Sequence, residues 1–257
     1  MKVVLFCGGQ GTRLREHSDS LPKPLICIGG RPILWHLMRY YAHYGHTEFV
    51  LCLGYRGDLI RDYFLNYEEC MSNDFTLSGD GGRVLHGSDV HDWSIRCLDT
   101  GLHSSIGQRL LLAREYVADE PIFLANYADG LSDLPLDRLI DEFASSRALV
   151  SFAAVPAPRT LTAVSADARG YVEAIGPPGD AHALINGGFF ALRPGVFDFM
   201  REGEELLEQP FARLVAQGRL MSYRHAGFWQ SLDTYADKVR FERMTARGEC
   251  PWAVWRT

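Results

Sequence analysis

The sequence contains no run of about 18 consecutive apolar residues, so we expect no membrane span. Its formal net charge of −6 argues against a nucleic-acid-binding surface, because such surfaces are normally basic. No two of its six cysteines have the Cys-x-x-Cys spacing, so neither a zinc site nor a disulfide framework is expected. With no signal-peptide pattern ahead of the first apolar run, the composition is typical of a cytoplasmic protein with reduced cysteines.

Lysine is scarce in this chain. The 26 basic residues include only three lysines, Lys2, Lys23 and Lys238, and the other 23 are arginines. Because the chain uses arginine so freely, the few lysines that persist are candidates for positions where a guanidinium cannot replace an ammonium group.

Two common nucleotide-binding motifs are absent from the glycine-rich segment near the N-terminus, Gly8-Gly9-Gln10-Gly11-Thr12-Arg13-Leu14. A dinucleotide fingerprint needs glycines at its first, third and sixth positions, and counted from Gly9 the sixth position is Leu14. A P-loop needs Gly-Lys-Ser/Thr after four spacer residues, and the segment has no such sequence. An NAD-type dehydrogenase is therefore disfavoured.

The same segment has the features of a phosphate cradle. An apolar run over residues 3–7 leads directly into the glycines, whose missing Cβ atoms let backbone N–H groups approach an anion. Arg13 adds a bidentate guanidinium, and Lys23, held between Pro22 and Pro24, adds a point charge. The competing interpretation, a glycine turn with two solvated bases, is disfavoured because both bases accompany the glycines.

Strand-like and helix-like segments alternate along the first 155 residues. This alternation predicts an α/β fold with a Rossmann-like mixed, mainly parallel sheet flanked by helices. Ligands of such sheets bind at the carboxyl ends of the strands, so residues 8–13 and Asp129 are expected to meet there. Strands are expected at 2–7, 48–53, 95–99, 121–125 and 148–155, and helices at 32–44, 59–64, 107–116 and 136–145.

After residue 155 the pattern changes to short strands separated by proline and glycine, at 161–164, 171–175 and 184–192. They predict a smaller antiparallel extension, followed by helices at 211–216 and 234–244. No internal repeat, low-complexity tract or linker divides the chain. We expect a single domain over residues 1–257, its nucleotide-binding part at about 1–155 and its acceptor-binding and C-terminal part at about 156–257.

Two aspartates are candidate ligands of Mg²⁺, which prefers one or two carboxylates with phosphates and waters completing its shell. Asp129 follows a buried strand and precedes Gly130, and Asp233 lies in the segment Ser231-Leu232-Asp233-Thr234. The alternative for Asp233 is an ordinary N-cap of the helix that begins near Thr234. Asp133 is interpreted as a helix N-cap ahead of Pro135.

Several motifs, in order, resemble those of the sugar-1-phosphate nucleotidylyltransferases. The glycine-rich segment with Thr12-Arg13-Leu14, followed by Lys23-Pro24, resembles the signature of that family. Later segments are similar to its glucose-1-phosphate cytidylyltransferase branch: Gly29-Gly30-Arg31-Pro32-Ile33-Leu34-Trp35-His36, Tyr127-Ala128-Asp129-Gly130-Leu131-Ser132-Asp133, Ile185-Asn186-Gly187-Gly188-Phe189-Phe190, and His225-Ala226-Gly227-Phe228-Trp229-Gln230 with Asp233-Thr234. The resemblance extends over about residues 1–245 and is weakest at 72–93.

The resemblance implies in-line transfer of a cytidylyl group from CTP to a sugar-1-phosphate such as glucose-1-phosphate, with release of pyrophosphate. Mg²⁺ would be held by Asp129 and Asp233, and Arg13 and Lys23 would act on the β,γ- and α-phosphates as the catalytic residues. The other expected nucleotide-binding residues are Gly8, Gly9, Gly11, Thr12, Gly107 and Gln108. The expected sugar-binding residues are Tyr127, Asn186, Gly187, Gly188 and Lys238.

One segment departs from the family pattern. Family members usually carry Glu-Lys-Pro ahead of the Asn-Gly-Gly turn, where the lysine holds the sugar phosphate, and here the Glu-Lys pair is Gly176-Pro177. Three explanations stay open. In the first, another base holds the sugar phosphate, with Lys238, Arg159 and Arg169 as candidates. In the second, the acceptor is a different phosphorylated molecule. In the third, the protein binds nucleotide in a regulatory role without turnover.

The expected partners are thus CTP and a sugar-1-phosphate, with neither nucleic acid nor membrane among them. The resemblance also implies a homo-oligomer. Its candidate contact surfaces are the aromatic-rich residues 63–75 and the tail at 250–255.

Overall fold

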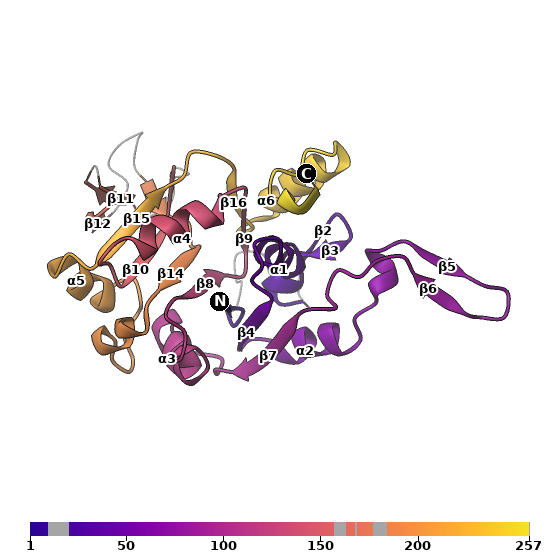
Figure 1. The fold of residues 1–257 in the computed structure, drawn as a ribbon, viewed down its shortest axis with the longest axis horizontal. Coiled ribbons are helices and arrows are strands. Elements are labelled where there is room, and N and C mark those ends of the chain that lie inside the picture. The colour runs from indigo at the N-terminus through magenta and orange to yellow at the C-terminus, as the bar shows by residue number, and fades with distance from the viewer. Residues whose placement is uncertain (10–20, 157–162, 168, 177–183, 257) are drawn as a thin grey trace.

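The computed structural model describes residues 1–9, 21–156, 163–167, 169–176 and 184–256. These residues fold around a ten-stranded mixed sheet (Figure 1). Its parallel part contains, in spatial order, β7 (Ser94–Asp99), β4 (Glu48–Leu53), β1 (Lys2–Phe6) and β8 (Phe123–Tyr127). The rest of the sheet contains β14 (Phe190–Leu192), β10 (Val150–Pro156), β13 (Leu184–Asn186), β15 (Leu220–Arg224), β11 (Ala163–Ala166) and β12 (Val172–Gly176).

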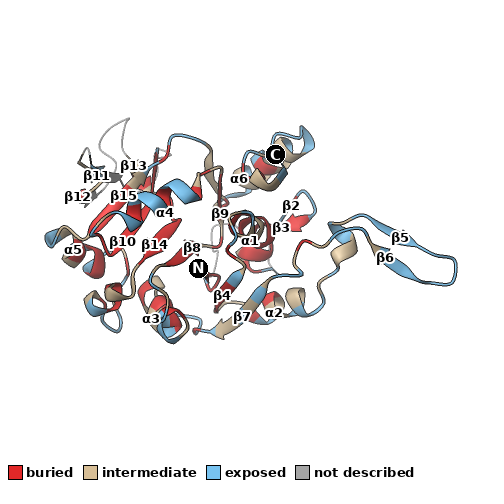
Figure 2. Cartoon of the chain, in the orientation of Figure 1, coloured by how far each residue is buried: buried red, intermediate tan, exposed pale blue. Residues whose placement is uncertain are grey.

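Helices cover both faces of the sheet, and the alternation along β1 shows why. Val3 and Leu5 belong to one hydrophobic core, while Val4 and Phe6 belong to the other. A parallel strand buried on both faces has to be apolar throughout, and the central strands are correspondingly buried in Figure 2. The first core is formed with α1 (Ile33–His43), α2 (Gly57–Leu65), α4 (Leu136–Ala144) and α6 (Tyr235–Ala246), and the second with α3 (Ile106–Val117) and α5 (Gln209–Ala216).

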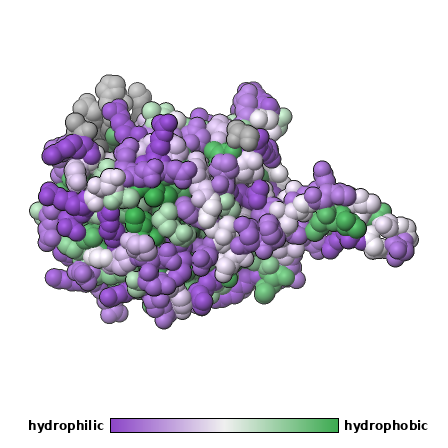
Figure 3. Space-filling model, viewed as in Figure 1, coloured by the Kyte–Doolittle hydropathy of each residue, from purple (hydrophilic) through white to green (hydrophobic). Residues whose placement is uncertain are grey.

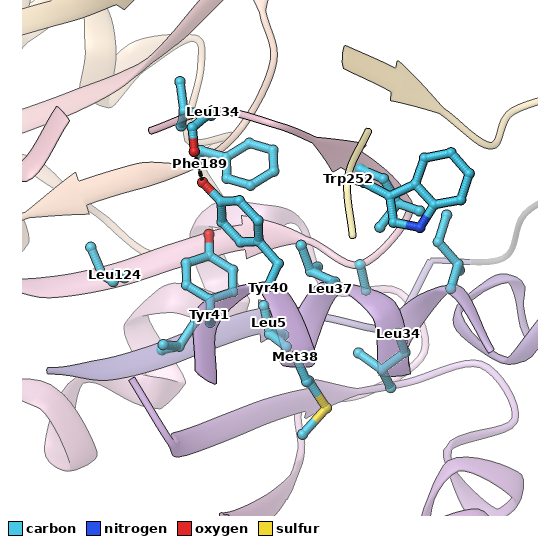
Figure 4. Packing of buried hydrophobic residues seen from close by; sticks show 14 of the residues in the cluster. Leu5, Leu34, Leu37, Met38, Tyr40, Tyr41, Leu124, Leu134, Phe189 and Trp252 are labelled. Carbon is cyan, nitrogen blue, oxygen red and sulfur yellow. Dashed lines mark hydrogen bonds between the residues drawn. The ribbon is translucent and has the colours of Figure 1, made fainter. Parts of the chain in front are cut away.

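The core between the sheet and α1 also fixes one unusual backbone position (Figure 4). Tyr40 and Tyr41 of α1 are buried and pack on Phe189, with ring centroids 5.2 and 6.1 Å from its ring. The hydroxyl of Tyr40 donates to the carbonyl of Leu134 at 2.5 Å. Phe189 has φ +51, which is uncommon for a bulky residue, so packing against the two tyrosines holds it in that conformation.

Most predicted elements are confirmed within a few residues, among them the strand at 48–53 and the helix at 136–145, observed as α4. The prediction of one strand over 184–192 is wrong. Gly188 and Phe189 have φ +79 and +51, which interrupts the extended backbone between β13 and β14. The antiparallel strands after residue 155 belong to the central sheet itself, because β14 pairs with β8.

Several short strands have no counterpart in the prediction, because two- and three-residue strands show no periodicity. β5 (Phe75–Leu77) and β6 (Arg83–Leu85) form a hairpin that projects from the body of the molecule (Figure 1). The others are β2 (Cys27–Ile28), β3 (Arg31–Pro32), β9 (Gly130–Ser132) and β16 (Trp229–Ser231). Cys27 of β2 is exposed. Every helix in the described ranges is too short or too polar to cross a bilayer.

Candidate active site

The glycine-rich segment begins just after β1, and the side chain of a buried arginine contacts its first residue, Gly8. Arg109 of α3 donates to the carbonyl of Gly8 at 3.1 Å, to the carbonyl of Leu53 at 3.1 Å, and to the hydroxyl of Thr100. A Cβ on Gly8 would overlap the Arg109 guanidinium, so this position requires glycine. Arg109 is only 2% exposed, and burial lowers the pKa of its guanidinium from the ordinary value.

The sequence prediction missed Arg109. It lies beside Leu110 and Ala113 on the buried face of α3. A charged residue at an apolar position of the helical pattern could therefore have indicated a buried arginine. Such an arginine is retained only where its donors are satisfied, and here three strand ends or loops supply the acceptors.

A short two-stranded ladder brings the two predicted metal ligands together. β9 and β16 pair antiparallel, with Gly130 opposite Ser231, and the N–H of Leu232 donates to the carbonyl of Asp129 at 2.8 Å. Asp129 and Asp233 flank the same end of this ladder, although 104 positions separate them in the sequence. The backbone pairing therefore sets the separation of the two carboxylates.

Asp133 closes the other end of the ladder. Its Oδ1 accepts from the backbone N–H of Phe228 at 2.8 Å and lies 2.9 Å from Nε2 of the buried His225. A Cβ on Gly227 would be 2.5 Å from the same oxygen, so only glycine fits there. The prediction of Asp133 as a helix N-cap is wrong, because Pro135 is the N-cap of α4 and no side chain caps that helix.

Lys23 lies between the two aspartates. It begins a short 3₁₀ turn, Lys23–Leu25, and its Nζ is 2.5 Å from Asp129 Oδ2 and 2.7 Å from Asp233 Oδ1. The lysine side chain is only 13% exposed. Burial alone would lower the pKa of Lys23, but the two carboxylates outweigh that effect and raise it above the ordinary value.

The N-cap interpretation of Asp233 does not hold. Thr234 is the N-cap of α6, and its hydroxyl accepts from the N–H of Asp237 while the Asp237 carboxylate accepts from the N–H of Thr234. The Asp233 carboxylate is instead directed towards Lys23 and also accepts from the hydroxyl of Ser231 at 2.7 Å. Asp233 is thus available for the role predicted for it.

The segment Asn186-Gly187-Gly188 lies against the end of β8. The Asn186 side-chain amide donates to the hydroxyl of Tyr127 at 3.2 Å, and its oxygen accepts from the N–H of Gly188 at 2.8 Å. The indole N–H of Trp229 donates to the carbonyl of Gly187 at 2.8 Å. The predicted sugar-binding residues of this segment are therefore brought together beside Asp129, and burial raises the pKa of Tyr127, which keeps its hydroxyl neutral.

A cleft connects these groups. Gly9, Lys23, Tyr127, Asp129 and Asp233 all contribute to its walls, at the carboxyl ends of β1 and β8 as predicted for a sheet of this type. Among the described residues, the cleft is lined by Phe6, Cys7, Gly9, Lys23, Pro24, Ile106, Tyr127, Ala128, Asp129 and Asp233. The predicted residues Gly11, Thr12 and Arg13 lie outside the described residues.

Three of the predicted residues have other surroundings. Gln108 completes a capping box with Ser105 at the start of α3, and Gly107 packs closely on the backbone of Glu204. Their roles as nucleotide ligands stay predictions. Lys238 lies on α6, where it lines a surface groove with Tyr235 and Glu242, and it is not among the residues that line the cleft.

The bases considered as replacements for the missing lysine are also accounted for. Arg169 lies in the turn between β11 and β12, its side chain is 83% exposed, and it pairs with Asp167 at 3.6 Å. Arg159 lies outside the described residues. A base that the prediction did not consider is Arg224, at the end of β15, a strand that the prediction lacked.

Arg224 lies at the same register position of the sheet as Asn186, in the predicted sugar-binding segment. Ala154 of β10 lies opposite Asn186 on one side and opposite Arg224 on the other, so both side chains share one face of the sheet. Two strand spacings separate their Cα atoms by roughly 10 Å. Arg224 is exposed, and its side chain has neither a hydrogen bond nor an ion pair with the residues that the structure describes.

The carboxylate pair fits a magnesium ion that carries phosphate ligands. Within the described ranges no group of three or more His, Cys, Asp or Glu side chains could enclose a metal. Mg²⁺ is usually bound by one or two carboxylates, with substrate phosphates and waters completing the octahedron. Asp129 and Asp233 present that number of carboxylates beside an open cleft.

Comparisons with known proteins agree with this fold. A family model described as nucleotidyl transferase matches residues 2–235. The chain is 39% identical to a probable glucose-1-phosphate cytidylyltransferase of Bacillus subtilis and 39% identical to the glucose-1-phosphate cytidylyltransferase of Salmonella typhi, each match covering 99% of this chain and 100% of the relative. The chain therefore belongs to the nucleotidyl transferase family, as a nucleotidylyltransferase similar over nearly its whole length to glucose-1-phosphate cytidylyltransferases.

Solved structures share the fold at lower sequence identity. HddC from Yersinia pseudotuberculosis has a TM-score of 0.76 at 19% identity, over 95% of this chain and 99% of that one. A UDP-glucose pyrophosphorylase from Acinetobacter baumannii has a TM-score of 0.75 at 16% identity, over 98% and 95%. The predicted fold class is thereby confirmed.

Proposed function

We propose that the chain is a Mg²⁺-dependent cytidylyltransferase that joins CTP to a sugar-1-phosphate, glucose-1-phosphate or a close relative, and releases pyrophosphate. The observation that carries this proposal is the convergence of Lys23, Asp129 and Asp233 in one cleft beside Tyr127 and Asn186. The names of the two 39% identical relatives support CTP as the nucleotide and glucose-1-phosphate as the acceptor. A cytoplasmic location is part of the same proposal.

The composition of the cleft suits nucleotidyl transfer. The attacking atom is a phosphate oxygen that is already ionised near neutral pH, so the reaction needs neither a nucleophilic side chain nor a general base. It needs in-line positioning and neutralisation of charge on the phosphates. Lys23 supplies a buried ammonium group for the α-phosphate, and the backbone of Gly9 borders the same cleft. Mg²⁺ held by Asp129 and Asp233 would neutralise phosphate charge in the transition state.

The acceptor side depends on a different base from the usual family lysine. β12 ends at Gly176, where the family motif would begin. We assign the contact with the acceptor's anionic group to Arg224, because it is level with Asn186, on the same face of the sheet, and has no partner in the described part of the chain. A charge-assisted contact of this kind contributes about 1.5–3 kcal/mol to binding.

The proposal includes a homo-oligomer. The tail at 250–255 is a poor contact surface, because Trp252 is 1% exposed and packs on Phe241 and His36 of its own chain. The β5–β6 hairpin is the better candidate, since Phe75, Leu77 and Val84 are 44, 68 and 59% exposed. In Figure 3 apolar atoms gather on this projecting element, which suits burial against another copy.

The test is release of pyrophosphate by the purified protein with Mg²⁺, CTP and glucose-1-phosphate, against a blank without the sugar phosphate. Asp129→Asn should abolish sugar-dependent release while CD spectra stay unchanged, whereas Asp119→Asn, a surface control that pairs with Lys2, should keep full activity. Full activity of Asp129→Asn would contradict the metal assignment. Binding of CTP with no product from any sugar phosphate would favour the regulatory alternative, which the missing Glu-Lys pair motivates.

A further inference from the structure

The position between Asp129 and Asp233, where a metal ion is proposed to bind, is one that the Lys23 ammonium group itself contacts. Its Nζ lies within 2.7 Å of one oxygen from each carboxylate. The contact is partly shielded from water, since the three side chains are 13, 30 and 24% exposed. One ammonium group thus contacts two carboxylates.

A divalent cation and this ammonium group compete for the same oxygens. A metal ion that bound both carboxylates would displace the ammonium, and a partly buried lysine without a partner is costly. The flanking residues Pro22 and Pro24 restrict the backbone around Lys23, and the two carboxylates hold its ammonium group in the cleft. Free metal therefore binds less tightly, because its binding breaks the contacts between the Lys23 ammonium and the two carboxylates.

A triphosphate in the cleft removes that penalty. Phosphate oxygens beside Lys23 give the displaced ammonium a new anionic partner, and they also complete the coordination shell of a metal held by the two aspartates. Each ligand thereby makes the binding of the other more favourable. By linkage the coupling is reciprocal: the factor by which nucleotide tightens metal equals the factor by which metal tightens nucleotide.

We propose that Lys23 is an internal counter-cation that keeps the aspartate pair closed to free divalent metal and opens it only when a nucleoside triphosphate draws the ammonium away. This proposal rests on the proposed function, because it takes Asp129 and Asp233 as the metal ligands. Its consequence is that the protein selects the metal–nucleotide complex and ignores the metal alone. Lys23 thus has a role in ligand selection that is separate from its contact with the α-phosphate.

The direct test is a titration of the full-length protein with Mn²⁺ alone, in which free Mn²⁺ is read by its EPR signal. Lys23→Met removes the competing charge and should tighten Mn²⁺ binding about 10- to 100-fold, the range of a charge-assisted contact. Lys23→Arg keeps the charge and should bind Mn²⁺ as weakly as wild type. Lys2→Met removes a lysine that pairs with Asp119 away from the cleft, and should also behave as wild type.

A second measurement tests the coupling. Calorimetry gives the affinity for CTP with and without Mg²⁺, and the ratio of the two should be larger for wild type than for Lys23→Met. Association of Mg²⁺ with CTP in solution is common to both proteins and cancels in the comparison. CD spectra and melting temperature of each variant separate a change in binding from a loss of fold.

The outcomes separate this proposal from the function on which it rests. Equal Mn²⁺ affinity of wild type and Lys23→Met overturns the counter-cation role. The proposed function would still hold if wild type releases pyrophosphate in a sugar-dependent manner and Asp129→Asn does not. In that case only the counter-cation role of Lys23 would be wrong. Both the counter-cation role and the metal assignment are supported if Lys23→Met binds Mn²⁺ tightly and the double variant Lys23→Met/Asp129→Asn does not.

Discussion

The backbone N–H of Leu232 donates a 2.8 Å hydrogen bond to the carbonyl oxygen of Asp129, and this contact completes the β9–β16 ladder at the cleft. Two three-residue strands are too short to be stable alone, so their pairing depends on what holds the far end. That end is held by Asp133, whose carboxylate binds Phe228 and His225. The spacing of the carboxylates of Asp129 and Asp233 is thus maintained by a residue that does not line the cleft.

Asp133→Ala should therefore reduce activity without removing a ligand. Losing hydrogen bonds to a charged acceptor should cost about 1.5–3 kcal/mol in the free energy of unfolding, measured by urea denaturation. It should also weaken Mn²⁺ binding in the presence of CTP, because the two aspartates are no longer held at one separation. Asp137→Ala, on the nearby helix α4, is the matched control. A loss of stability with unchanged metal binding would show that the ladder end does not position the aspartates.

The contact between Gly8 and Arg109 predicts strong coupling between two substitutions. Gly8→Ala places a methyl group against the guanidinium. Arg109→Met removes one donor each from the carbonyls of Gly8 and Leu53, which still accept from the backbone N–H groups of Tyr55 and Thr100. Each should destabilise the fold by about 2 kcal/mol or more. The double variant should lose less than the sum, because methionine leaves room for the added methyl group. Urea denaturation of the four proteins gives the coupling energy, and additivity would mean that the two residues act independently.

The sequence was sufficient for features that are local. The glycine-rich segment, Lys23 and the aspartates that follow a buried strand or precede a helix are each visible within a few residues, and the structure brings the described ones together in one cleft. The alternation of apolar strands and amphipathic helices was likewise enough for the α/β sheet.

Features that depend on distant contacts were not visible. Arg109 meets Gly8 across 101 positions, and Asp133 meets Phe228 across 95, so neither partner could be deduced from spacing. Asp133 matched the local pattern of a helix N-cap, and a tertiary contact outweighed that propensity. The break at Gly188 was missed because its positive φ depends on the packing of Phe189 against α1.

The proposed homo-oligomer should be held together by the β5–β6 hairpin. Leu77→Asp together with Val84→Asp puts charges on exposed apolar positions of the hairpin and should lower the assembly state measured by analytical ultracentrifugation. Leu112→Asp changes a residue of α3 that is 49% exposed and should leave the assembly intact. A double hairpin variant that sediments as wild type would place the interface elsewhere.

The buried His36 predicts a loss of stability in mild acid. Burial, assisted by the charges of Arg256 and Arg31, lowers the pKa of His36 from 6.5 to about 4. Its Nε2–H donates to the carbonyl of Ile28 and its Nδ1 accepts from the indole of Trp252, so the neutral ring fits the site. Since the unfolded chain takes up a proton near pH 6.5 and the folded chain only near pH 4, stability falls as the pH drops through that window.

His36→Gln should remove part of that dependence. Between pH 6 and pH 4.5, the variant takes up one proton fewer than wild type when it unfolds. The slope of its unfolding free energy against pH should therefore be smaller by up to about 1.4 kcal/mol per pH unit. His46, whose pKa burial also lowers to about 4, leaves a second contribution in place. His43→Gln, an exchange elsewhere on α1, is the control. If the unfolding free energies of wild type and His36→Gln change with pH in parallel, protonation of the His36 ring does not destabilise the folded protein.

Arg224 is the substitution that tests the acceptor side alone. Arg224→Gln should raise KM for the sugar phosphate about tenfold or more and leave KM for CTP within twofold, because the side chain lies beyond Asn186 and is absent from the lining of the cleft that holds Lys23 and the aspartates. Arg169→Gln, at an exposed turn with Asp167 as its partner, should change neither constant. Lys238→Gln completes the set, since Lys238 was predicted for this role and lines a different groove. If Lys238→Gln alone raises KM for the sugar phosphate, α6 rather than β15 supplies the replacement charge.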